Sequence, residues 1–128
     1  MGKRGSVLRD KSYRFAIRIV RLSQYLKQDK KEFELSKQIL KSGTSVGASI
    51  REAEYAQSDA DFINKFSISL KEANETVFWL SLLKDTDYLE ENLFNSLSAD
   101  CNEIISMLVS SINTMKNKKN TKLLTLSS

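Results

Sequence analysis

The strongest constraint on the fold of this chain is its shortage of residues that end helices. The 128 residues include no proline, and all four glycines lie before residue 48. Proline and glycine are the residues that most often break helices and form turns, and an all-β fold needs many turns. The sequence therefore predicts an all-α protein, and its length is that of a single domain.

Apolar residues recur at steps of three and four, which places them on one face of a helix. In the first such segment these residues are Phe15, Ile19, Leu22 and Leu26. The pattern predicts a four-helix bundle over residues 1–116 and a basic, disordered tail over 117–128. The four predicted helices span about residues 6–28, 30–56, 59–84 and 88–115.

Capping residues indicate where the second and third helices begin, and two glycines indicate how the second helix packs. Asp29 is expected to cap the second helix, and Ser58, followed by a carboxylate at Asp61, is expected to cap the third. Gly43 and Gly47 lie one turn apart, and each costs about 1 kcal/mol relative to alanine inside a helix. We interpret them as a place where another helix comes close, because the segment lacks the Gly-Lys-Ser/Thr ending of a phosphate-binding loop.

The first helix also carries a second apolar face. Tyr13, Ile17 and Val20 fall together at about 100° per residue, away from the buried stripe. A helix with two apolar faces needs a second partner, so these three residues are predicted to form an oligomer interface.

Charge is distributed unevenly along the chain. Residues 1–31 carry a net charge of +8, residues 32–115 carry −8, and residues 116–128 carry +4. A basic stripe runs along the first helix at steps of three, four and three, and it consists of Lys11, Arg14, Arg18 and Arg21. These residues, assisted by the tail lysines Lys118, Lys119 and Lys122, are the predicted binding site for RNA or DNA phosphates. The alternative is that the stripe pairs with acidic residues of the same fold or of another subunit.

Several classes of function are disfavoured by what the sequence lacks. There is no histidine and Cys101 is the only cysteine, which removes the usual general base, the commonest metal ligand and any disulfide or Cys-Cys metal pair. Glu72 and Glu75 lie one turn apart, but carboxylate-bridged metal sites in bundles normally also use histidine. We therefore expect no catalytic residues, no metal and no cofactor. No apolar run is long enough for a membrane span, and we expect a cytoplasmic protein without a membrane partner.

Three segments of the sequence resemble one bacterial family. They are the run from Phe33 to Ala53 with its Ser-Gly-Thr-Ser motif, the segment Gln57–Ile63, and the block Leu70–Leu80 that contains Glu-Thr-Val-Phe-Trp-Leu. Together they resemble the four-helix-bundle proteins of the 23S rRNA intervening-sequence family, and the resemblance covers about residues 7–116. Ser49 departs from the pattern, which has asparagine there.

The resemblance implies an antiparallel up-down-up-down bundle that assembles as a ring-like homopentamer, and it implies no catalytic residues. It also implies kinship with the accessory proteins of diversity-generating retroelements, which are basic pentamers that bind nucleic acid and a reverse transcriptase. The leading hypothesis is a non-enzymatic oligomer that binds RNA or DNA. The alternative is a protein-interaction scaffold with no role in nucleic-acid binding.

Overall fold

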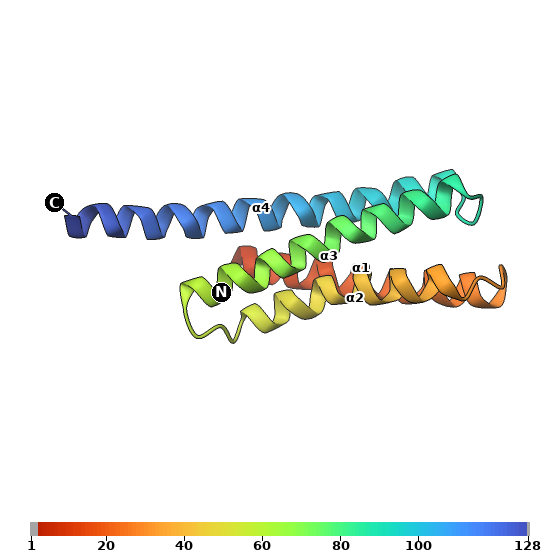
Figure 1. The fold of residues 1–128 in the computed structure, drawn as a ribbon, viewed down its shortest axis with the longest axis horizontal. Helices are drawn as coiled ribbons and strands as arrows, with labels where there is room; N and C mark the ends of the chain where they lie inside the picture. Colours follow the sequence, from red (N-terminus) through yellow and green to blue (C-terminus); the bar gives the residue numbers. More distant parts are fainter. Residues whose placement is uncertain (1–2, 128) are drawn as a thin grey trace.

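The chain folds into four helices that run alternately up and down. The computed structural model describes residues 3–127, apart from the side chains at positions 3, 4, 6, 119 and 127, and this range contains no strand. The helices are α1 (Lys3–Gln28), α2 (Glu34–Ala53), α3 (Asp59–Asp85) and α4 (Glu91–Ser127). Each helix packs against the next, and α1 also packs against α4, which closes the bundle (Figure 1). The predicted four-helix bundle is confirmed. Among these helices, none combines the length and apolar character required to span a membrane.

The core forms where the apolar stripes of the four helices meet. Phe15, Ile19, Leu22 and Leu26 of α1 are all buried, as their spacing predicts. The stripe on α4 is buried from Leu97 to Ile112 and includes Cys101 and the residues Ile104 and Leu108. Each fully buried side chain of this size stabilises the fold by about 1.5–3 kcal/mol relative to an exposed one.

Close contact between α1 and α2 explains the two glycines of α2. A Cβ atom at Gly43 would lie 2.7 Å from Cγ2 of Ile19, and one at Gly47 would lie 3.3 Å from the carbonyl oxygen of Ser12. A side chain at Gly43 would push α1 away, and one at Gly47 would pack tightly against the backbone of Ser12. The prediction that these glycines serve helix packing is confirmed.

Cys101 is a buried apolar residue rather than a reactive thiol. Its Sγ donates to the carbonyl oxygen of Ala73 on α3 at 3.3 Å. Burial, and to a smaller extent the charge of Asp100, raises the pKa of this thiol to about 12. The thiolate, which is the nucleophilic form, is therefore negligible near neutral pH.

The helices α2 and α4 both begin later than the sequence predicts, whereas α1 begins earlier, at Lys3 rather than at about residue 6. α2 begins at Glu34 and not at residue 30, because Lys31 has a left-handed backbone (φ 55°) that interrupts the helix. Glu32, and not Asp29, caps it: the Glu32 carboxylate accepts hydrogen bonds from the backbone N–H groups of Glu34 (2.7 Å) and Leu35 (2.5 Å). α4 begins at Glu91 rather than at 88, after a second left-handed residue at Asp87 (φ 67°).

The start of α3 agrees with the prediction. The Ser58 hydroxyl accepts the backbone N–H of Asp61 at 3.1 Å. In return, the Asp61 carboxylate accepts the backbone N–H of Gln57 at 3.2 Å. Two backbone donors that the helix leaves without partners are satisfied in this way.

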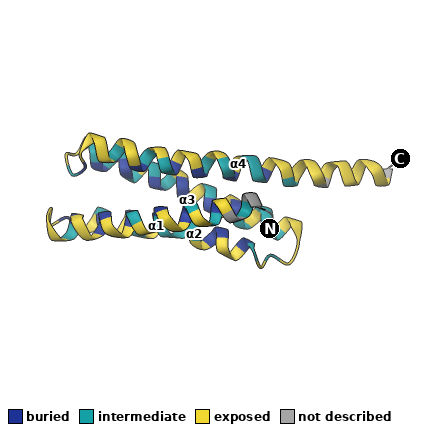
Figure 2. Cartoon of the chain, turned by 180° about the vertical axis from the view of Figure 1, so that it is seen from behind, coloured by how far each residue is buried: buried dark blue, intermediate teal, exposed yellow. Residues whose placement is uncertain are grey.

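The C-terminal segment is the largest departure from the sequence prediction. Residues 117–128 were expected to form a disordered tail, but α4 continues without a break to Ser127. No proline or glycine follows residue 47, so no residue of this kind ends the helix. Among the described side chains of α4, Ile112 is the last buried one. The C-terminal part of the helix extends past the rest of the bundle (Figures 1 and 2).

Candidate nucleic-acid interface

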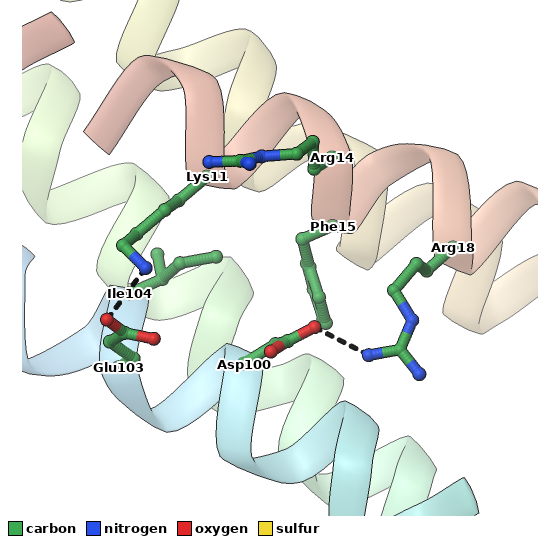
Figure 3. Close-up of a pocket in the computed structure, with 7 residues that line it drawn as sticks. All are labelled: Lys11, Arg14, Phe15, Arg18, Asp100, Glu103 and Ile104. Atoms are coloured by element: carbon green, nitrogen blue, oxygen red, sulfur yellow. Dashed lines mark hydrogen bonds and ion pairs between the residues drawn. The ribbon is translucent and has the colours of Figure 1, made fainter. Parts of the chain in front are cut away.

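The candidate site is the cationic face of α1, by which we mean Lys11, Arg14, Arg18 and Arg21. The steps of three and four residues along one continuous helix bring these side chains to the same side of α1. That side borders α4, so the cationic face forms one edge of the seam between the first and last helices (Figure 3).

Two of the four cations are held by side chains of α4. The Nζ of Lys11 lies 2.7 Å from a carboxylate oxygen of Glu103. The guanidinium of Arg18 donates to the carboxylate of Asp100 at 2.5 Å and to the hydroxyl of Ser96 at 2.9 Å. These side chains are all partly exposed, so each pair contributes only about 0–1 kcal/mol to stability.

The other two cations, Arg14 and Arg21, are exposed. Among the described side chains, no carboxylate lies within ion-pair distance of either guanidinium. Figure 3 shows Arg14 across the cleft from Asp100 and Glu103, with no interaction drawn to either. The structure therefore divides the predicted stripe into two anchored cations and two that remain available to a ligand.

The seam beside these residues is hollow. One cleft of about 300 Å³ lies between α1 and α4, with Phe15 and Ile104 among its lining residues, and Asp100 and Glu103 on its α4 side. A second cleft follows along the seam at Arg21, and its apolar lining includes Leu93. Leu93 continues the apolar stripe of α4 towards the start of the helix, but it is 38% exposed at this cleft. The carboxylates make the first cleft unsuitable for an anion, so a phosphate would have to meet Arg14 and Arg21 at the rim.

The predicted tail lysines lie elsewhere. Lys118 and Lys122 are exposed on the part of α4 that extends beyond the bundle, and neither lines the clefts. The side chain of Lys119 is outside the described part of the structure.

The predicted oligomer face lies on another side of α1. The exposed fraction of the residue is 59% for Tyr13, 37% for Ile17 and 36% for Val20. Beside Tyr13, a hollow between α1 and α2 has Gly47 and Ala48 in its lining, where small residues leave the surface recessed. These residues form an apolar surface that α2, α3 and α4 leave uncovered.

The sequence left open that the cationic face pairs with acidic residues of the same fold, and the structure shows such pairs for Lys11 and Arg18, but sequence reasoning did not identify the partner residues. Ser96, Asp100 and Glu103 occur at steps of four and three, which is the spacing expected for one side of α4. That repeat is the signal by which the pairing with the stripe on α1 could have been found. The axial alignment of the two helices, however, was not available from the sequence.

The described residues offer no arrangement typical of a metal site. Within residues 3–127, no group of three or more Cys, Asp or Glu side chains is placed to hold a metal ion.

Comparison with known proteins adds two similarities. A family model described as "23S rRNA-intervening sequence protein" matches residues 6–110. A crystal structure of a protein of unknown function from the S23 ribosomal protein family of Bacteroides thetaiotaomicron is 55% identical, and the match covers 86% of this chain and 98% of that chain with a TM-score of 0.85. A comparison with curated proteins finds no match.

Proposed function

The chain belongs to the family of 23S rRNA-intervening sequence proteins, and from this premise we propose that it is a non-enzymatic, cytoplasmic homo-oligomer that binds RNA or DNA. The contacts are made to phosphates, and the exposed arginines Arg14 and Arg21 make them. The observation that carries the proposal is that these two residues lie exposed on the cationic face, without an acidic partner among the described side chains. They also belong to a segment, residues 1–31, with a net charge of +8.

The geometry of Arg14 and Arg21 suits a phosphate backbone. They are seven positions apart in the sequence, which is about two turns of helix and about 10 Å along the axis. Successive phosphates of one strand of duplex DNA lie about 3.4 Å apart along the axis, so the two arginines span about three steps. The planar guanidinium donates two parallel hydrogen bonds to a phosphate, whereas a lysine acts as a point charge.

The anchored cations support this arrangement. Lys11 and Arg18 are held by carboxylates of α4, and Arg14 lies between them along the helix. Contacts of this kind position a nucleic acid without reading its sequence, because they reach phosphates and not base edges.

Assembly increases the strength of such contacts. We propose that Tyr13, Ile17 and Val20 are covered by a second copy of the chain in a homopentamer. Each cationic face would then occur five times, and several weak contacts to one polyanion would add by avidity.

A binding experiment tests the proposal. The variant R14Q/R21Q removes two charges while it keeps side-chain length and helix propensity. The matched control is K37Q/K41Q, which removes two charges from exposed lysines on α2. Affinity for duplex DNA and duplex RNA is measured by fluorescence anisotropy between 50 and 200 mM salt. The slope of log affinity against log salt is expected to fall by about 1.8 for R14Q/R21Q on DNA and to stay unchanged for the control. A parent protein without salt-dependent binding to any polyanion would refute the proposal.

One observation favours a second candidate function. Lys11 and Arg18 are already paired within the chain, which is the arrangement expected of a scaffold whose cations serve its own fold. In that case the partner is a protein, of which a reverse transcriptase is the example that the sequence resemblance implies. A parent protein that binds no polyanion would support this function.

A further inference from the structure

The C-terminal part of α4 is a helical arm that extends beyond the bundle. The arm comprises residues 113–127 and follows Ile112, which is the last buried residue among the described side chains of α4. Figure 2 shows it exposed on the side in view. The family match ends at residue 110, so the arm lies outside the region that defines the family.

The arm is strongly cationic. No aspartate or glutamate follows Glu103, whereas lysines occupy positions 116, 118, 119 and 122. The side chains described at three of these positions, Lys116, Lys118 and Lys122, are exposed. Such a segment favours contact with a polyanion.

Two other uses of the arm fit its sequence less well. If several arms associated through the apolar stripe of α4, position 119 would follow Ile112 and Met115 in the interface between the arms. Position 119 is a lysine, and the lysines of neighbouring arms would repel one another. A membrane-surface helix needs one uninterrupted apolar face, but positions 116 and 119, which are both lysines, fall on the same side of the helix as Leu123 and Leu126 at about 100° per residue.

Helix geometry aligns part of the arm with the α1–α4 seam. Eighteen residues of an α-helix make five full turns, so Lys118 points from the same side of α4 as Asp100, the partner of Arg18. Lys122 lies about one turn further along the same side. Lys116 is about 160° away from Lys118 around the helix, because two residues rotate by about 200°.

The distance between the two cationic elements can be obtained from the same geometry. Arg21 and Leu97 line one cleft, which places Arg21 near residue 97 along α4. From residue 97 to Lys122 the helix rises about 38 Å at about 1.5 Å per residue. A duplex with about 3.4 Å per base pair covers that distance with about eleven base pairs.

We infer that the arm is a second phosphate-binding element, which uses Lys118 and Lys122 to extend the contact of the cationic face along a double-stranded nucleic acid. This inference rests on the proposed function of Arg14 and Arg21. The arm and the cationic face of α1 form one line along this side of α4, so a duplex of about eleven or more base pairs covers the full length from Arg21 to Lys122. A shorter duplex reaches only part of the line.

The test compares duplexes of 8 and 16 base pairs, each as DNA and as RNA. With 16 base pairs of DNA, the slope of log affinity against log salt is expected to be steeper by about 1.8 for the parent protein than for K118Q/K122Q, because the parent makes two more phosphate contacts. When the salt concentration rises from 50 to 200 mM, the parent should therefore lose about twelvefold more affinity than the variant. With 8 base pairs the difference is expected to be smaller. The single variants K118Q and K116Q form a matched pair, since each removes one exposed lysine of the arm, and only K118Q should weaken binding to the long duplex. Circular dichroism verifies that all variants keep their helices.

The outcomes separate this inference from the proposed function. If the parent binds the long duplex in a salt-dependent manner and K118Q/K122Q binds it equally well with the same slope, the inference about the arm is wrong and the proposed function stands. Equal losses for K116Q and K118Q would also overturn it, because the aligned side of the arm would then have no special role. If the parent binds no duplex, both fail. Equal slopes on DNA and RNA would indicate contact with phosphates alone, and a larger slope on one of them identifies the preferred duplex.

Discussion

The two neighbours of α1 are held by different kinds of contact. On the α2 side, Gly43 and Gly47 allow the helix backbones to approach so closely that a Cβ at Gly43 would collide with Ile19. On the α4 side, the contact includes two partly exposed ion pairs beside hollow clefts. Dense apolar packing fixes the position of α1 with little tolerance, whereas the ion pairs contribute little stability and leave charged groups at the surface. The comparison shows that α1 is held in place mainly by its packing against α2, and that its charged side chains lie at the surface on the side that borders α4.

The largest expected effect comes from breaking the α1–α2 contact. Gly43→Leu should lower the free energy of unfolding by about 3 kcal/mol or more, because overpacking forces the two helices apart. Chemical denaturation measures this change. The double variant G43L/I19A should be less destabilised than the sum of the two single variants, since both residues act at one contact. An unchanged stability of Gly43→Leu would show that the packing argument is wrong.

An intermediate effect is expected on the exposed apolar side of α1. Ile17→Glu should keep the helical content of the chain, because residue 17 is 37% exposed within one subunit. It should nevertheless yield smaller species, because a charge would be buried without a partner between subunits. Light scattering measures the mass, with Asn64→Glu on the exposed surface of α3 as the control. A parent protein that is monomeric at micromolar concentration would exclude this interface.

The smallest effect on stability is expected at the α1–α4 seam. The variant D100N/E103Q removes the acidic partners of Arg18 and Lys11 and should change the free energy of unfolding by less than about 2 kcal/mol, since each partly exposed pair contributes about 0–1 kcal/mol. Its affinity for duplex DNA at low salt should rise severalfold, because two cations are released and two repelling charges disappear. The control E90Q/E91Q removes two exposed carboxylates near the start of α4, away from this part of the seam. A decrease in affinity for D100N/E103Q would indicate that DNA binding depends on the two intact ion pairs and not on the number of unpaired cations.

Local features of the helix ends show how far sequence reasoning reaches. The cap of α3 was predictable because Ser58 and Asp61 act on backbone groups three or four residues away. The start of α2 was not, because it depends on the left-handed backbone of Lys31 and on a hydrogen bond from the Glu32 N–H to the carbonyl oxygen of Leu26. Capping propensities identify the residue types that favour a helix start. Where several such residues lie close together, the conformation of the preceding loop decides which of them caps the helix.

By itself, the sequence determined that this protein is helical, which face of each helix is buried, and that α2 meets a neighbour at its glycines. These properties follow from the period of the helix and from the transfer of apolar side chains out of water, both of which act along a single segment. Only the tertiary structure decided that Arg18 meets Asp100, that Lys11 meets Glu103, and that Arg14 and Arg21 have no acidic partner among the described side chains. The reason is that charge pairing between helices depends on their axial alignment, and this alignment is set by the packing of the whole core.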